Sequence, residues 1–214
     1  MIRVKICGLT DEAALAAAQE AGAAYLGFVF FARSPRCLTP ERAAELTASV
    51  RPGLARVGLF VDPDDALIGA VLDRAGIDII QLHGHETPER VAALREMTGL
   101  PVMKALGIAE AADLDMLPVY EAVADQILVD ARPPKGAPVP GGNGIAFDWR
   151  LIAGRRWARP WMLAGGLRPE NVAEAIRLTG VRQVDVSSGV ESAPGIKDPD
   201  RIRAFMAATR ALEG

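Results

Sequence analysis

Short apolar segments, most of them rich in β-branched residues, recur eight times along the chain, and their starts lie 22 to 34 residues apart. Nearly continuous apolar runs of this length are typical of strands that are buried on both faces of a parallel sheet. They predict strands at Ile2–Ile6, Tyr25–Phe30, Arg56–Val61, Asp78–Leu82, Pro101–Leu106, Gln126–Val129, Pro160–Leu163 and Gln183–Val186.

Amphipathic segments follow these runs and carry signals for helix ends. Thr10, Thr39, Thr87 and Asp198 are residue types that cap helix N-termini, and proline follows three of them at the first helical position. We predict helices at Asp11–Ala21, Pro40–Ser49, Asp65–Ala75, Pro88–Met97, Ala109–Val119, Phe147–Ile152, Pro169–Leu178 and Pro199–Leu212.

The alternation of strands and helices predicts an α/β fold. Eight parallel strands, each followed by a helix, close into a (β/α)8 TIM barrel, and we expect one domain over residues 1–214. An open doubly wound sheet is the alternative, but the even spacing and the number of units favour the closed barrel. Long loops are expected at 31–39 and 131–146, both on the face where barrels build active sites.

Composition excludes several classes of partner. Half of the residues are hydrophobic, and the net charge is −3 with both signs mixed along the chain. Without a basic stripe, nucleic acid is not an expected partner. Acidic residues interrupt the Ala-rich N-terminal segment, so we expect no signal peptide and no membrane span. The two cysteines, Cys7 and Cys37, make no disulfide framework, which suits a cytoplasmic protein.

Cys7 ends the first predicted strand. A side chain there points into the mouth of the barrel, and Lys5 lies two residues earlier on the same face of the strand. A nearby cation favours the thiolate form of a cysteine. The alternative is a small buried side chain with no chemical role. Cys37 lies in a loop, and we expect no role for it.

Asp130 ends the sixth predicted strand, after Ile127-Leu128-Val129. Burial favours the protonated form of a carboxyl group, which would let Asp130 act as a general acid; the alternative is a role in anchoring the loop. Two other aspartates compete with it. Asp62 precedes Pro63 and is expected in a turn, whereas Asp185 lies within the last strand and is expected to pair with a lysine in the barrel.

Glycine-rich turns follow the last two predicted strands, at Gly165-Gly166 and Ser188-Gly189. Glycine lets backbone N–H groups approach an anion closely, and these two loops form the recurrent phosphate site of the barrel fold. A phosphorylated small molecule is therefore the expected substrate. Ordinary tight turns are the alternative.

Arg36, in the loop after the second strand, could hold a substrate carboxylate through paired hydrogen bonds. Its alternative is a solvated surface arginine. His83 and His85 have a spacing that can bind a metal, but the chain has two histidines in all and no further ligand cluster is evident. We therefore expect no metal, with Gln81 facing the barrel and His83 facing the loop.

Taken in order, the motifs resemble those of the phosphoribosylanthranilate isomerase family of tryptophan biosynthesis. The resemblance runs from end to end of the chain, through Lys5-Ile6-Cys7-Gly8, Ser34-Pro35-Arg36, Gln81-Leu82-His83-Gly84, Leu128-Val129-Asp130, Leu163-Ala164-Gly165-Gly166 and Asp185-Val186-Ser187-Ser188-Gly189-Val190-Glu191. At position 143 the chain has Asn where the family commonly has Thr.

The resemblance implies an aldose–ketose isomerase that performs an Amadori rearrangement without a cofactor. It implies that Cys7 is the general base, Asp130 the general acid and Arg36 the ligand of the anthranilate carboxylate. It further implies that the Gly165-Gly166 and Ser188-Gly189 backbone holds the phosphate. The sequence leaves open whether the protein is a monomer or a homodimer.

Two other functions fit parts of the same pattern. A related barrel that acts on an aminoaldose of histidine synthesis resembles this chain, but those isomerases use paired aspartates where this chain has Cys7. A barrel that binds a phosphorylated ligand without turning it over would keep the Gly-rich loops and lose Cys7 or Asp130, both of which are present.

Overall fold

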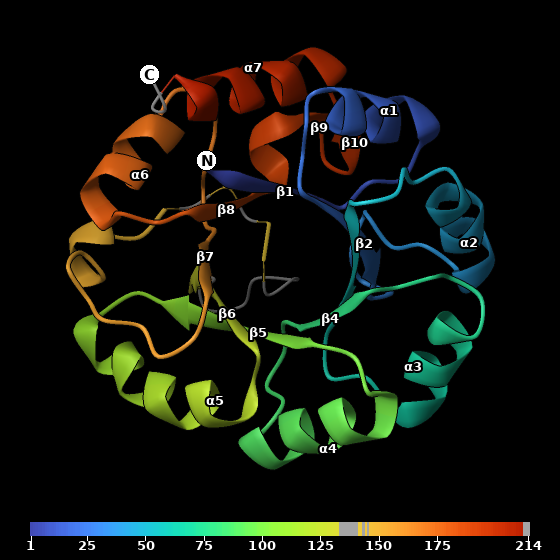
Figure 1. Cartoon of the computed structure of the whole chain (residues 1–214), viewed down its shortest axis with the longest axis horizontal. Helices are drawn as coiled ribbons and strands as arrows, with labels where there is room; N and C mark the ends of the chain where they lie inside the picture. The colour runs from blue at the N-terminus through green and yellow to red at the C-terminus, as the bar shows by residue number, and fades with distance from the viewer. Residues whose placement is uncertain (133–140, 143, 145, 212–214) are drawn as a thin grey trace.

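Eight parallel strands close into a barrel in chain order, as the sequence predicts (Figure 1). The structure is a computed structural model that describes residues 1–132, 141–142, 144 and 146–211. The strands are β1 Arg3–Cys7, β2 Tyr25–Phe30, β3 Ala55–Phe60, β4 Ile79–Leu82, β5 Val102–Ile108, β6 Gln126–Ala131, β7 Trp161–Leu163 and β8 Gln183–Val186.

Helices surround the barrel, and the C-terminal helix closes the ring by packing against the first helix (Figure 1). The α-helices are α1 Glu12–Glu20, α2 Pro40–Ala48, α3 Asp65–Leu72, α4 Pro88–Thr98, α5 Leu117–Val123, α6 Val172–Thr179 and α7 Pro199–Arg210. Three short 3-10 segments accompany them, η1 Ala111–Met116, η2 Trp149–Leu151 and η3 Ser188–Val190.

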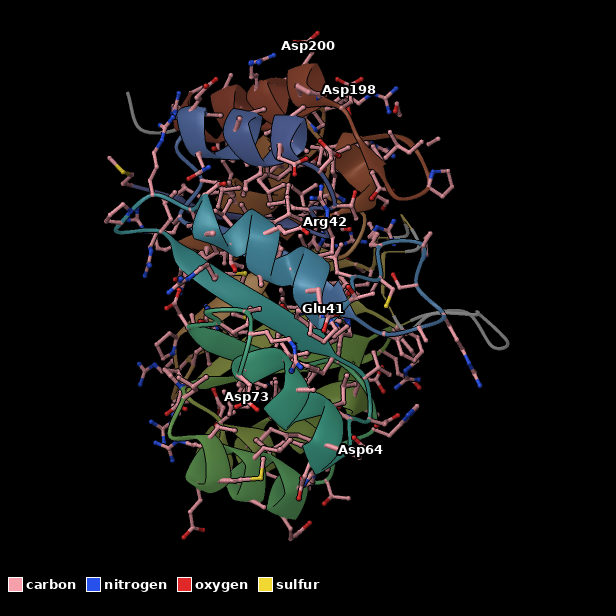
Figure 2. All side chains as sticks on the ribbon, turned by 90° about the vertical axis from the view of Figure 1, so that its right-hand side faces the viewer. Glu41, Arg42, Asp64, Asp73, Asp198 and Asp200 are labelled. Carbon is pink, nitrogen blue, oxygen red and sulfur yellow. The ribbon has the colours of Figure 1, made fainter. Side chains whose placement is uncertain are left out.

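Aspartate and threonine side chains cap several of these helices. Thr39, Thr87 and Asp198 each accept a hydrogen bond from a backbone N–H in the first turn, as predicted. The cap of α1 is Asp11 rather than Thr10, because the Asp11 carboxylate accepts from the N–H of Ala14. Figure 2 shows acidic caps of this kind at the starts of α3 and α7.

Two predicted helices differ from the structure. The segment predicted as Ala109–Val119 divides into η1 and α5, because Pro118 fits only the first turn of a helix and not its interior. The segment predicted as Phe147–Ile152 forms only the single turn η2. Of the other predicted features, Leu212, Asn143 and residues 133–140 of the long loop predicted at 131–146 lie outside the described residues.

Alternate residues of each strand point into the barrel and fill it in layers. Tyr25, Val57, Met103, Leu128 and Met162 form one apolar cluster in the barrel, and at the strand starts the Tyr25 hydroxyl and the Gln126 amide donate to Gln183 Oε1. Cys7 lies higher, at the mouth, against Val29 and Leu59. A larger apolar cluster fills the space between strands and helices. Another group of polar side chains, Asp130 among them, gathers at the mouth formed by the C-terminal ends of the strands.

A small antiparallel hairpin follows β8 at this mouth. Its strands are β9 Glu191–Ala193 and β10 Ile196–Lys197. This hairpin is not predicted from the sequence, since strands this short leave no pattern in it. Within the part of the chain that the structure describes, no helix is long and apolar enough to cross a membrane.

Candidate active site

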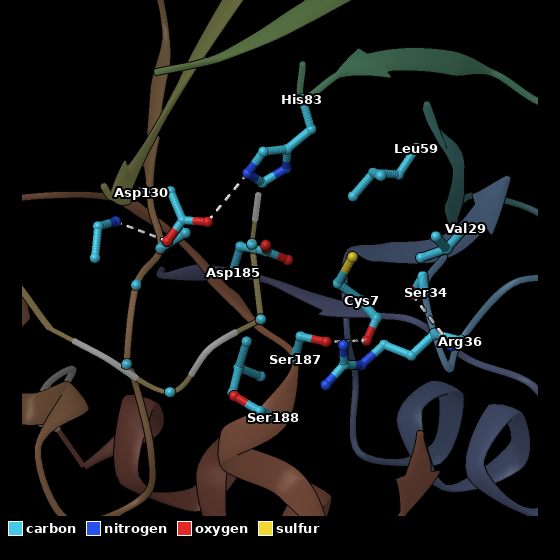
Figure 3. Close-up of a pocket in the computed structure, with 18 of the residues that line it drawn as sticks. Cys7, Val29, Ser34, Arg36, Leu59, His83, Asp130, Asp185, Ser187 and Ser188 are labelled. Carbon is cyan, nitrogen blue, oxygen red and sulfur yellow. Dashed lines mark hydrogen bonds and ion pairs between the residues drawn. The ribbon is translucent and has the colours of Figure 1, made fainter. Parts of the chain in front are cut away.

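Cys7, Arg36 and Asp130 line one cavity at the mouth of the barrel (Figure 3). Cys7 ends β1, Asp130 lies near the end of β6, and Arg36 comes from the loop after β2. More than a hundred residues separate Cys7 from Asp130 in sequence, and closure of the sheet brings them to opposite sides of this cavity (Figure 3). Gly165, Gly166 and Ser188 line the same cavity, and Gly189 lies in the adjoining hollow.

Lys5 and Asp185 form a buried ion pair beneath the Cys7 thiol. The Lys5 ammonium lies 3.0 Å from Asp185 Oδ1, which confirms the predicted pairing of Asp185 with a lysine. Burial raises the pKa of the Cys7 thiol and the Asp185 charge raises it further, while the Lys5 charge lowers it. The net pKa is raised, so Lys5 favours the thiolate as expected but does not outweigh burial.

The raised pKa of Cys7 predicts slow alkylation at neutral pH. In a Cys37→Ser background, the rate of reaction with iodoacetamide should keep rising above pH 9.0, the ordinary value for a thiol. Asp185→Asn removes an anion that opposes the thiolate and releases Lys5 from its partner. That variant should therefore alkylate at lower pH, measured by mass spectrometry. If the midpoint pH of alkylation in Asp185→Asn is the same as in wild type or higher, the assigned role of the ion pair is contradicted.

Asp130 is held by its neighbours on both carboxylate oxygens. The backbone N–H of Ala131 donates to Oδ1 at 2.7 Å, and His83 Nε2 lies 3.1 Å from Oδ2. His83 thus belongs to the site, and the prediction that it faces the loop is wrong. Gln81 faces the barrel interior as predicted, and its Nε2 lies 3.1 Å from His83 Nδ1.

The two histidines do not converge on a common point. The His85 side chain is 96 % exposed and its Nδ1 lies 3.4 Å from Asp62, whereas His83 is half-buried beside Asp130. Asp62 lies in a turn, as predicted, with a φ of 46°. Over the described residues, no group of three or more histidine, cysteine, aspartate or glutamate side chains could hold a metal ion.

Arg36 is buried and bound by a glutamate from the hairpin after β8. Its Nε and Nη2 donate to the two carboxylate oxygens of Glu191 at 2.6 and 2.8 Å. The ammonium of Lys197 also donates to Glu191, at 2.5 Å, and to the Ser187 carbonyl at 3.1 Å. The group of Arg36, Lys197 and Glu191 therefore carries one net positive charge, which suits an anionic substrate group.

Glu191 titrates far from its ordinary range. Burial would raise the pKa of its carboxyl, but hydrogen bonds and charges from Arg36 and Lys197 lower it to about 2. A lowered pKa means that the contribution of Glu191 to stability is complete above 4.5, the ordinary value, and is lost as pH falls through about 2.

Glu191→Gln should destabilise the protein by about 3 kcal/mol at pH 7, because it leaves two buried cations without their anion. Urea unfolding measures this loss. The difference from wild type should shrink between pH 4.5 and about 2, as the wild-type carboxyl takes up its proton. Glu174→Gln, at an exposed position of α6, is the matched control and should leave stability unchanged. Equal stabilities of wild type and Glu191→Gln at pH 7 would contradict this account.

The glycine-rich turns after β7 and β8 pack against each other. Gly165 and Gly166 have φ values of 83° and 62°, a region that side-chain-bearing residues rarely adopt. A Cβ atom on Gly189 would overlap the carbonyl oxygen of Leu167, so the close approach of the two turns requires glycine there. Both turns reach the edge of the cavity, as the predicted phosphate site requires.

Three side chains at this site are not among those that the sequence predicts, namely His83, Glu191 and Lys197. His83 directly follows β4, and that position is the signal that places it at the mouth, whereas Glu191 and Lys197 lie in the hairpin of β9 and β10. Glu191 and Lys197 also stand within or beside the motifs of the family resemblance, but no role was assigned to them.

Comparisons with known proteins agree on one family. The family model for N-(5′-phosphoribosyl)anthranilate (PRA) isomerase matches residues 4–208. The N-(5′-phosphoribosyl)anthranilate isomerase of Paracoccus denitrificans is 65 % identical over 210 residues, which are 98 % of each chain. The crystal structure of phosphoribosyl anthranilate isomerase from Thermotoga maritima has a TM-score of 0.88 at 37 % identity and covers 99 % of this chain and 100 % of its own.

A further similar structure contains a ligand. It is a phosphoribosyl anthranilate isomerase in complex with reduced 1-(o-carboxyphenylamino)-1-deoxyribulose 5-phosphate, with a TM-score of 0.86 at 36 % identity. It covers 99 % of this chain and 100 % of its own. The ligand of that protein carries a carboxylate and a phosphate, the two anionic groups for which the present cavity has candidate partners.

Proposed function

The chain belongs to the N-(5′-phosphoribosyl)anthranilate isomerase family, and on that premise we propose that Cys7 and Asp130 perform its reaction as base and acid. The chain is an aldose–ketose isomerase of tryptophan synthesis, and its substrate is a phosphorylated small molecule. The observation that carries the assignment of roles is the position of Cys7 and Asp130 on opposite sides of one cavity (Figure 3). We further propose that it acts in the cytoplasm, as a monomer or a homodimer.

Asp130 begins the reaction by giving a proton to the ring oxygen of the sugar. The bond between that oxygen and C1′ breaks, and the anthranilate nitrogen supplies the electron pair that forms a Schiff base. The burial of Asp130 suits this step, because few water molecules reach the carboxyl group to compete with the ring oxygen for the proton.

Cys7 then removes the proton from C2′ as a thiolate. The resulting enolamine becomes the ketose, 1-(2-carboxyphenylamino)-1-deoxyribulose 5-phosphate. The raised pKa of Cys7 makes the thiolate a minor form at neutral pH and a stronger base where it occurs. The neighbouring Lys5 ammonium stabilises that form when the proton leaves.

The two ends of the substrate are held by different parts of the mouth. Arg36 receives the anthranilate carboxylate, with its guanidinium fixed by Glu191. The turns at Gly165-Gly166 and Ser188-Gly189 receive the phosphate through backbone N–H groups. The sugar then lies between them, over Cys7 and Asp130.

Gly189→Ala tests the phosphate site. The added methyl group would push the turn after β8 away from Leu167, so the backbone donors of the two turns would no longer converge. We expect the KM to rise about tenfold or more, the effect of weakening charge-assisted hydrogen bonds, with a parallel loss of inhibition by inorganic phosphate. Gly69→Ala, in helix α3 with open space around it, is the control and should keep the wild-type KM. An unchanged KM in Gly189→Ala would place the phosphate elsewhere.

Turnover of two substrates tests the proposed function. The purified chain should rapidly abolish the fluorescence of phosphoribosylanthranilate generated in the assay, and should leave the histidine-pathway aminoaldose unchanged. Turnover of the aminoaldose alone would show that the wrong isomerase has been assigned. Binding of phosphoribosylanthranilate by the folded chain without turnover would favour a binding-only barrel.

A further inference from the structure

Three polar side chains form a row from the barrel interior to the site of proton transfer. Gln81, on β4, is completely buried, and its Nε2 lies 3.1 Å from His83 Nδ1. On the other side of the ring, His83 Nε2 lies 3.1 Å from Asp130 Oδ2 (Figure 3). The row ends at the carboxylate that is the general acid of the proposed function, on which this inference rests.

The directions of these hydrogen bonds define one protonation state. An amide nitrogen only donates, so His83 Nδ1 accepts from Gln81 and the imidazole proton is on Nε2, from which it is donated to Asp130. The Ala131 N–H donates to the other carboxylate oxygen. Asp130 therefore accepts on both oxygens, as an ionised carboxylate does, and this state lacks the proton that the reaction requires.

In the state that carries the required proton, the carbonyl oxygen of Gln81 is the hydrogen-bond acceptor for His83. It is buried and has no hydrogen-bond partner within the described residues. A half turn of the amide would direct this oxygen at His83 Nδ1, which would then be a donor. The ring would carry a proton on Nδ1 and share a second proton with Asp130 across the 3.1 Å contact.

We propose that Gln81 and His83 are positioning residues that store the acid proton next to Asp130, and that the Gln81 amide turns when the proton is loaded. The loaded state is an imidazolium beside a carboxylate, with the Gln81 carbonyl accepting from Nδ1. During turnover the Nε2 proton moves to Asp130 Oδ2 and from there to the ring oxygen of the sugar. The imidazole is left neutral with its proton on Nδ1.

The protons balance over one cycle. Cys7 takes the C2′ proton and returns it to C1′ when the enolamine becomes the ketone. The proton that leaves the 2′-hydroxyl in that step returns through Asp130 to His83 Nε2 and restores the imidazolium. No proton is gained or lost overall, as an isomerisation requires.

Other charged groups surround the pair and are unchanged in the variants below. Those of the described residues that line the same cavity are Cys7, Arg36, Arg132 and Asp185. The buried Lys104–Glu86 pair lies behind the loop after β4, where Glu86 accepts from the N–H of Gly84. The glycine at position 141 covers the contact itself, since a Cβ there would come within 2.9 Å of His83 Nε2.

The pH dependence of kcat/KM separates storage of a proton from a purely structural role. On the acid side of the kcat/KM profile, the limb is the pH range in which His83 takes up the stored proton. On the alkaline side, the limb is the pH range in which Cys7 ionises. His83→Asn should move the acid limb down by about two pH units, the difference between ordinary imidazole and carboxyl values, and lower the plateau about 100-fold. Gln81→Met should move the acid limb in the same direction, and the alkaline limb should stay in both variants.

His85→Asn is the matched control, because its exposed ring lies outside the cavity. It should keep the wild-type profile. A lower rate in His83→Asn with an unmoved acid limb would overturn the proposal. If Asp130→Asn keeps its turnover, the proposed function fails instead, since the acid has then been misassigned. If Asp130→Asn is inactive and the His83→Asn profile is unmoved, only the stored proton is refuted.

Nuclear magnetic resonance gives a readout that does not depend on activity or on a variant folding. The chain has two histidines, so a long-range 1H–15N spectrum contains two ring systems, which His85→Asn assigns. Above the acid limb, His83 should carry its proton on Nε2; below it, both ring nitrogens should be protonated. A ring that stays neutral across the acid limb, or that carries its proton on Nδ1 at high pH, would overturn the proposal.

Discussion

Cys7→Ser is expected to lower kcat about 10³-fold, the scale of losing a general base, and to leave binding of the substrate nearly unchanged. A hydroxyl group has almost the size of a thiol, so the contacts with Val29 and Leu59 at the mouth persist. It holds its proton far more firmly, however, and cannot remove the proton from C2′. An interaction made only in the transition state is thereby lost, which lowers kcat and kcat/KM together.

The control for this variant is Cys37→Ser. Cys37 is exposed and free, so its replacement should keep wild-type kcat. Binding is measured by titration with reduced 1-(o-carboxyphenylamino)-1-deoxyribulose 5-phosphate, the ligand seen in the similar enzyme. Wild-type turnover in Cys7→Ser would remove Cys7 from the mechanism. A loss of binding equal to the loss of rate would make it a packing residue instead.

Asp130→Asn is expected to lower kcat by a similar factor, about 10³-fold, because the amide cannot supply a proton to the ring oxygen. Its carbonyl oxygen still accepts from the Ala131 N–H, so the end of β6 should keep its conformation. The substrate should bind in its closed-ring form and stay there. Steady-state kinetics and titration with the same reduced ligand separate the two effects.

Asp115→Asn is the control for the loss of a negative charge, since Asp115 is exposed in η1 and is not among the described residues that line the cavity. It should leave kcat and KM at their wild-type values. Turnover in Asp130→Asn within a few-fold of wild type would show that another group delivers the proton. Asp185 lines the same cavity and would be the next candidate.

Much of the fold follows from local patterns in the sequence. The apolar runs Tyr25–Phe30 and Gln183–Val186 coincide with β2 and β8, because buried parallel strands leave a nearly continuous apolar segment. The predictions over Ala109–Val119 and Phe147–Ile152 were poorer. In the first case Pro118 begins a new helix, and in the second only the single turn η2 forms.

The residues of the site also divide into those that the sequence predicts and those that it does not. Cys7 and Asp130 could be found because each ends a recognisable strand, and strand ends meet at the mouth of a barrel. His83 lies one residue beyond β4, where strand alternation no longer gives the direction of a side chain, so its contact with Asp130 was not predicted. Glu191 and Lys197 reach Arg36 through a hairpin too short to leave a sequence pattern.

We propose that Cys7 and Asp130 together convert phosphoribosylanthranilate at this mouth. The most direct test follows the loss of anthranilate-linked fluorescence with wild type, Cys7→Ser and Asp130→Asn at equal concentrations. We predict a fast loss with wild type, and a loss close to spontaneous breakdown with both variants although each still binds the reduced ligand. A wild-type rate no faster than breakdown, or either variant at the wild-type rate, would contradict the claim.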